Sequence, residues 1–83
     1  MALLIDQARW PAHGTHFAHL VSDASIEELH DFVATLQTPR PLRFHRDHYD
    51  VPAALWSFVV DQGVTVVSTR EIVRRLRRAG LRA

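Results

Sequence analysis

The stretch Ala2-Leu3-Leu4-Ile5-Asp6 sets the architecture that this sequence predicts. Four apolar residues follow one another without alternation and end at a carboxylate, which is typical of a short strand covered on both faces. In a small domain such a strand lies in the middle of a parallel sheet. We therefore predict that residues 2–5 form a central strand with Asp6 at its carboxyl end.

Two other segments predict strands. Residues 42–45 alternate between apolar and polar side chains, and residues 64–67 are rich in β-branched side chains. Residues 10–14, which contain a proline and a glycine, predict a loop, because proline removes a backbone donor and glycine tolerates positive φ. We expect a short helical turn over residues 15–21.

Three helices are expected between and after these strands. Ser25 and Ser68 are each followed three residues later by a glutamate, which is the spacing of a capping box. They predict helices that end near residue 36 and at residue 79. A further helix is expected from the segment Asp50-Val51-Pro52 to Gln62. The alternation of strand and helix predicts an α/β fold, a Rossmann-like βαβαβα domain over residues 1–83 with a three-stranded parallel sheet in the order 2-1-3.

Composition narrows the classes of function. The chain has 83 residues, of which 47% are hydrophobic and 23% charged, as in an ordinary globular domain. It has no cysteine, which excludes disulfides, thiolate zinc sites and thiol nucleophiles, so any metal must bind nitrogen and oxygen. The apolar run of residues 2–5 falls far short of the roughly 20 residues that span a bilayer, so we expect a cytoplasmic protein without membrane contact. A homodimer would relieve the thin stability margin of so small a domain.

The charge is distributed unevenly along the chain. Residues 1–69 carry four arginines against eight acidic residues, whereas residues 70–83 carry six arginines against Glu71 alone. The arginines of the last helix, above all Arg74, Arg75 and Arg78, either form a solvated face or contact the phosphates of a nucleic acid.

Polar side chains follow all three predicted strands. Asp6 follows the first strand, residues 45–50 follow the second and residues 68–70 follow the third. Open α/β sheets bind ligands beyond the carboxyl ends of their strands. We therefore expect these segments to meet at one edge of the sheet.

The segment His48-Tyr49-Asp50 is the densest candidate for chemistry. His48 and Asp50 can point the same way with Tyr49 opposed, which places an imidazole beside a carboxylate that orients it or raises its basicity. Asp50 could instead cap the helix that follows, and Tyr49 could pack rather than act.

The histidines nearer the N-terminus predict metal coordination or, alternatively, loop histidines that bind backbone groups. His16 and His19 lie three residues apart, and His13 lies three residues earlier. Two histidines with one or two carboxylates suit zinc, manganese or iron. Asp6 could supply such a carboxylate or could cap the loop that follows it.

The chain resembles the family catalogued as domain of unknown function 4031, which consists of small bacterial and phage proteins. The resemblance covers nearly the whole length and rests on six groups of residues: a strand ending in Asp6; Arg9 and Pro11 with Gly14; His19-Leu20 with Ser22-Asp23; Glu28-Leu29-His30; Asp47-His48-Tyr49-Asp50; and Gly63. It implies that the residues that matter are Asp6, His19, Asp23, His48, Tyr49 and Asp50. Arg46 departs from the pattern, since many relatives have a glycine there. The family brings no established activity, although some relatives are joined to a phosphohydrolase-like domain.

These observations predict a domain that binds a phosphorylated ligand with the help of a divalent metal (zinc, manganese or magnesium), with phosphoester hydrolysis as the first reaction class. The expected metal ligands are Asp6, His19, Asp23 and His48. The expected catalytic residues are His48, Asp50, Tyr49 and Asp6, and the expected phosphate contacts are Arg46, Ser68 and Arg70. The alternative is a non-catalytic module that binds a nucleic acid or a protein through this pocket or the arginine-rich helix.

Overall fold

A mixed sheet of six strands forms the centre of the computed structural model, which describes residues 2–82. Its strands follow the order β4-β5-β3-β1-β6, and β2 pairs with β3 outside this path. The strands are β1 (Leu3–Ile5), β2 (Trp10–Ala12), β3 (Thr15–Ser22), β4 (Arg43–His45), β5 (His48–Pro52) and β6 (Thr65–Val66). The helices are α1 (Ile26–Leu36), the 3-10 helix η1 (Ala53–Leu55), α2 (Trp56–Val60) and α3 (Thr69–Arg78).

The prediction of a three-stranded parallel, Rossmann-like sheet is wrong. Among the described strands only β1 and β6 pair in parallel, and β1 pairs with β3 in antiparallel register. The prediction of a central first strand still holds in part, because β1 lies between β3 and β6. The topology differs because the segment next to β1, which was expected as a helical turn, is the strand β3.

The segment predicted as a helical turn over residues 15–21 is the long strand β3. Its inward side chains Ala18 and Leu20 alternate with His19, which is the period of a strand rather than of a helix. The turn before it, His13-Gly14, has positive φ at both residues, as the tight two-residue hairpin turns require. Part of the expected loop, Trp10–Ala12, is therefore the strand β2 of a hairpin with β3.

The helix that was expected to start at Val51-Pro52 and to run to Gln62 is also shorter than predicted. Residues 48–52 form β5, and helical structure begins only at Ala53, after Pro52. Proline is tolerated at a strand end, where its missing N–H does not interrupt the pairing. Asp50 does not cap the helix. It lies in β5, where it is paired with His19 of the neighbouring strand β3.

The other two helices confirm their predicted starts. The Ser25 side chain accepts a hydrogen bond from the Glu28 N–H at 3.0 Å, and the Ser68 side chain accepts one from the Glu71 N–H at 3.0 Å. Each serine therefore satisfies a backbone donor that the first turn of the helix leaves unpaired. The helices within residues 2–82 are all too short or too polar to cross a lipid bilayer.

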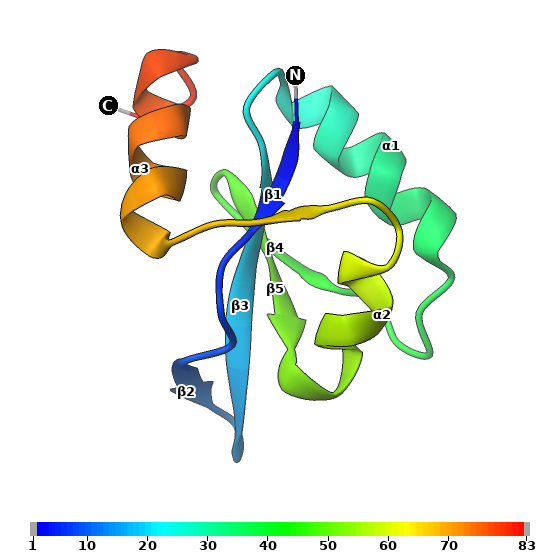
Figure 1. The fold of residues 1–83 in the computed structure, drawn as a ribbon. Coiled ribbons are helices and arrows are strands. Elements are labelled where there is room, and N and C mark those ends of the chain that lie inside the picture. Colours follow the sequence, from blue (N-terminus) through cyan, green and yellow to red (C-terminus); the bar gives the residue numbers. More distant parts are fainter. Residues whose placement is uncertain (1, 83) are drawn as a thin grey trace.

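The sheet has helices on both faces, α1 and α2 on one and α3 on the other (Figure 1). The core under α1 and α2 includes Ile5, Ala18, Leu20, Leu29, Val51 and Val59. The core under α3 is smaller and consists of Leu4, Val21, Ile72 and Leu76. Because α3 packs on Leu4 and Val21, the same face of β3 and β5 is left partly open farther along the strands, at His19 and Asp50.

The β4-β5 hairpin turn contains a strained residue, Arg46, whose φ is +60°. A residue with a Cβ atom is disfavoured in this left-handed region, where glycine costs little. We expect Arg46→Gly to raise the free energy of unfolding by about 0.5–1 kcal/mol in urea titration. The control Arg43→Gly, within β4, should lower it by a similar amount. A destabilised Arg46→Gly protein would contradict this interpretation of the turn.

Candidate metal centre

Two neighbouring strands bring three potential metal ligands together. In the antiparallel pairing of β3 and β5, His19 lies directly opposite Asp50. His48 lies two residues before Asp50 on β5 and therefore on the same face of the sheet. One ligand atom from each of these residues lies within 4.8 Å of the other two. The imidazole rings of His19 and His48 meet edge to face, with their centroids 4.9 Å apart.

A buried carboxylate fixes the orientation of His19. Its Nδ1 donates to Asp6 Oδ2 over 2.8 Å, and its backbone N–H donates to Asp6 Oδ1 over 2.6 Å. This arrangement sets the tautomer of His19, because Nδ1 carries the proton and Nε2 is left as the acceptor. The Nε2 atom of His19 is thus available to a metal ion.

Asp6 also links three parts of the chain. Thr69, at the start of α3, donates to Asp6 Oδ2 over 2.6 Å, and Trp56 Nε1 donates to the Asp6 backbone carbonyl over 2.8 Å. Only 1% of Asp6 is exposed. Burial alone would raise the pKa of Asp6, but the hydrogen bonds from His19 and Thr69 outweigh it and hold the pKa below the ordinary value of 3.8. Asp6 is therefore an ionised anchor behind His19.

His48 is oriented in the same manner. Its Nδ1 lies 3.0 Å from Asp47 Oδ1, and Asp47 in turn binds Arg82 through two hydrogen bonds of 2.8 and 2.9 Å. Burial raises the pKa of Asp47, but the hydrogen bonds from Arg82 and His48 lower it by more, so that the pKa lies below its usual value. The Nε2 atom of His48 points to Asp50 Oδ1 at 3.2 Å.

The chemistry of this set fits a divalent transition metal. Two imidazole nitrogens and one carboxylate are a ligand set of catalytic zinc and of non-haem iron sites. In each histidine a carboxylate contacts Nδ1, as is common for metal-binding histidines, and the Nε2 atom of His48 faces Asp50, the third member of the group. Two atoms bound to one zinc ion at about 2.1 Å lie at most about 4.2 Å apart, so the side chains would have to move slightly closer to bind one ion.

Tyr49, which the sequence places among the catalytic candidates, lies on the opposite face of the sheet. Its hydroxyl group is 2.8 Å from His30 Nδ1 on α1, and its ring packs beside Phe44. Successive side chains of a strand point to opposite faces, so Tyr49 cannot face the same way as His48 and Asp50. Tyr49 and His30 form a separate pair on the face of the sheet that α1 and α2 cover.

Asp23 also lies outside the cluster. It accepts a hydrogen bond from Arg75 at 2.9 Å and another from the backbone N–H of Ala2. Burial raises the pKa of Asp23, but these hydrogen bonds lower it more, so the net direction is downward. Asp23 thus connects the end of β3 to α3. Among residues 2–82 the group of side chains that could hold a metal ion consists of His19, His48 and Asp50 and does not include Asp23.

The predicted phosphate contacts divide between two places. Arg46 lines a cavity beside His48, whereas Ser68 caps α3 and Arg70 is exposed on its first turn. Of the arginines proposed for nucleic acid, Arg74 and Arg75 form ion pairs with Glu71. Arg78, the third of these arginines, is exposed, as are His13 in the hairpin turn and His16 in β3.

Three side chains around the centre carry little signal in the sequence alone. Asp47 has only its position next to His48 to suggest a role. Arg82 contacts Asp47 across 35 positions of the chain, which no local pattern reveals. Trp10 belongs to a segment that reads as a loop, yet its ring lies 5.2 Å from that of His19.

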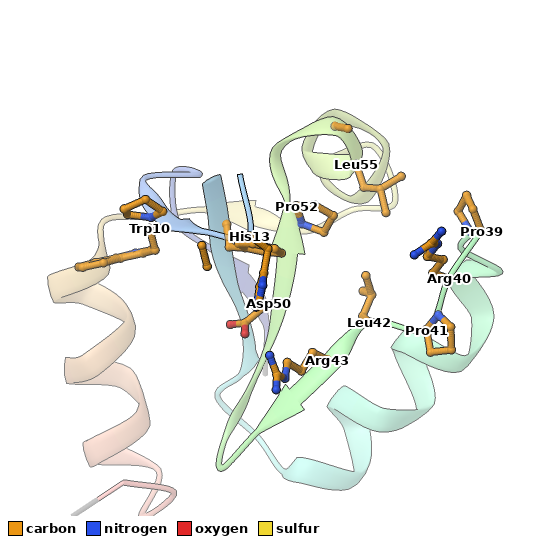
Figure 2. Close-up of a pocket in the computed structure, with 14 residues that line it drawn as sticks. Trp10, His13, Pro39, Arg40, Pro41, Leu42, Arg43, Asp50, Pro52 and Leu55 are labelled. Atoms are coloured by element: carbon orange, nitrogen blue, oxygen red, sulfur yellow. The ribbon is translucent and has the colours of Figure 1, made fainter. Parts of the chain in front are cut away.

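Two cavities flank the cluster. One is a groove of about 790 Å³ that runs from Trp10 past Asp50 to the segment Pro39–Leu42 (Figure 2). The other, of about 640 Å³, is lined by His45, Arg46, Asp47, His48, Leu81 and Arg82. Because Asp50 lines the first and His48 the second, an ion between these two residues would face both cavities.

Comparison with known proteins gives one family. The family described as "Protein of unknown function (DUF4031)" matches residues 3–79. No curated protein and no solved structure matches the chain.

Proposed function

We propose that this chain, which belongs to the DUF4031 family, binds one divalent metal ion through His19, His48 and Asp50 and hydrolyses a phosphoester. The observation that carries the proposal is the convergence of these three ligand atoms within 4.8 Å on two paired strands. The two orienting carboxylates, Asp6 and Asp47, support it, because each contacts the Nδ1 atom of its histidine and so orients the imidazole.

The ligand set favours some metals over others. Imidazole nitrogen suits zinc, manganese and iron, whereas magnesium prefers a shell of oxygen ligands. A metal ion at this site would supply a bound water of lowered pKa and a positive charge next to the reacting phosphorus. The chain itself contributes the fixed imidazoles and the cavities that hold the rest of the substrate.

The cavity beside His48 supports a phosphoester as the substrate. Arg46 and Arg82 carry guanidinium groups there, and the exposed His45 lies with its ring centroid 5.6 Å from that of His48. Arg82 is partly neutralised by Asp47, so Arg46 is the arginine of this cavity that has no carboxylate partner among residues 2–82. We place the non-bridging oxygens of the phosphoryl group against Arg46, which can donate two parallel hydrogen bonds.

The proposal is tested by loading and turnover. Protein stripped with a chelator is titrated with zinc, manganese, iron(II) and magnesium, and the bound metal is counted after dialysis. We expect one equivalent of a transition metal and no retained magnesium. Hydrolysis of bis(p-nitrophenyl) phosphate should then depend on that metal. A protein that retains no metal from any solution overturns the metal centre, and a loaded protein without turnover overturns hydrolysis of this ester.

Arg82 should act as a positioning residue for His48. Arg82→Ala leaves Asp47 without its bidentate partner, so the Asp47 carboxylate is freer to turn away from His48 Nδ1. We expect the metal affinity to fall by about 10- to 100-fold, as is usual when an outer partner of a metal-binding histidine is lost.

The control is Arg78→Ala, which removes an exposed arginine of α3 and should leave the affinity unchanged. Arg82→Lys should restore part of the loss, since lysine keeps the charge. Circular dichroism should show that both alanine variants are folded. Equal metal affinity in the two folded variants would contradict a positioning role.

A further inference from the structure

We infer that the groove beside Asp50 holds a flat aromatic ring of the substrate. A substrate that has such a ring together with a phosphate at the metal centre is a nucleotide. This inference rests on the proposed function, since it places the phosphate of the nucleotide at the metal centre. It adds a binding subsite, an identified stacking residue and a substrate class.

The groove has the size and the lining that a small organic ligand requires. Its volume is about 790 Å³, within the range of about 300–1,000 Å³ typical of ligand pockets. The wall is mainly apolar and includes Trp10, Phe17, Leu42 and Leu55. Asp50 lies between Trp10 and Arg43 in this wall (Figure 2). A ligand in the groove would therefore contact Asp50, one of the three candidate metal ligands.

Trp10 provides a stacking surface at the end of the groove that is nearest to the metal ligands. The residue is 46% exposed, although it carries a large apolar side chain. Its ring lies 5.2 Å from that of His19 and is tilted by 54°, so the indole stands over one side of the cluster. An exposed aromatic ring beside a charged site is the arrangement with which proteins stack nucleobases.

The charges at the groove favour an anionic ligand. Arg43 lies directly opposite Asp50 in the pairing of β4 and β5, and Arg40 lies on the far wall. Within residues 2–82 neither guanidinium group forms an ion pair, and Asp50 is the single carboxylate among the residues that line the groove. Asp50 is itself assigned to the metal, so the groove combines an apolar wall for a ring with positive charge that attracts an anionic ligand.

Binding of non-hydrolysable analogues separates the ring from the phosphate. The zinc-loaded protein is titrated with the methylene phosphonate analogue of AMP and with that of ribose 5-phosphate, and binding is followed by calorimetry. We expect the AMP analogue to bind at least about fivefold more tightly, since stacking of one base contributes about 1–3 kcal/mol. Trp10→Ala should remove this difference and Trp10→Phe should keep most of it.

The matched control is Phe58→Ala, which removes another exposed aromatic side chain, on α2 and outside the residues that line the groove. It should leave both affinities unchanged. A six-residue oligoadenylate distinguishes a free nucleotide from a nucleotide within a strand. Tighter binding of the oligomer assigns the site to single-stranded nucleic acid, and equal or weaker binding assigns it to mononucleotides.

Failure of this inference can be told apart from failure of the metal centre. Zinc stoichiometry is measured first, on the same preparation. If one equivalent of zinc binds but the two phosphonates bind equally, or if Trp10→Ala keeps the preference, the aromatic subsite is wrong and the metal centre stands. If zinc does not bind, the proposed function fails, and the phosphonates then test the groove by itself.

Discussion

Replacing His48 by alanine is expected to abolish stoichiometric zinc binding and metal-dependent hydrolysis while the protein stays folded. His48 contributes one of the three ligand atoms that converge within 4.8 Å. His19 and Asp50 would remain, but a catalytic zinc ion is usually held by three protein ligands, and two are too few. We expect the zinc affinity to fall by more than about 100-fold, beyond the loss typical of an outer-shell change.

His45→Ala is the matched control for this substitution. His45 lies opposite His48 in the β4-β5 hairpin, and their ring centroids are 5.6 Å apart. It belongs to the same strand pair but not to the ligand group. Zinc stoichiometry after dialysis and a competition titration with a chromogenic chelator give the two affinities. Similar losses in both variants would show that the hairpin, and not the His48 imidazole, is what the metal requires.

The helices with capping boxes could be predicted because their signals are local. Ser25 and Ser68 accept hydrogen bonds from backbone donors three residues later, and nothing distant in the chain is needed for that. The strand β3 could not be recognised in the same way. Its histidines at positions 16 and 19 have the spacing of a helical turn, and its pairing includes the distant residues 3–5 and 49–52 as well as the neighbouring residues 10–12. The distant pairings cannot be recognised from a short window of sequence.

The sequence names the residues of the site more readily than it gives their arrangement. His19, His48 and Asp50 lie together because β3 and β5 pair in antiparallel register, and not because the ends of parallel strands meet, while Asp6 contacts His19. One part of the expected edge is real: β1 and β6 are parallel, and Asp6 and Thr69, which follow them, share a hydrogen bond.

The division of roles within this group depends on side-chain direction, which residue types do not specify. Tyr49 is opposed to His48 and Asp50, as expected, and faces α1, because neighbouring residues of a strand point to opposite faces. Asp6 is a carboxylate like Asp50, but both of its oxygens are taken by His19 and Thr69. The structure thus separates a ligand from its anchor where the sequence shows two aspartates.

Replacing Asp6 by alanine is expected to lower the free energy of unfolding by about 3 kcal/mol or more. The substitution leaves three donors without their acceptor in a buried place: the His19 ring, the His19 backbone N–H and the Thr69 hydroxyl group. Each unsatisfied buried group costs about 1–3 kcal/mol. Small domains have a total stability of about 5–15 kcal/mol, so the loss is large. Urea unfolding in the presence of a chelator measures it without a contribution from metal.

Asp31→Ala is the control for this loss, since Asp31 is an exposed acidic residue of α1 and its removal should change stability by less than about 0.5 kcal/mol. The pH dependence supplies an independent check with Asp6→Asn. The pKa of Asp6 is lowered in the folded protein, so its ionised form stabilises the fold above the ordinary value of 3.8, and this stabilisation is lost as the pH falls through the lower, folded value. The stability gap between the wild type and Asp6→Asn should therefore narrow as the pH falls below about 4. A gap that stays the same into acid would mean that Asp6 does not act as an ionised anchor, and the fixed orientation of His19 would need another cause.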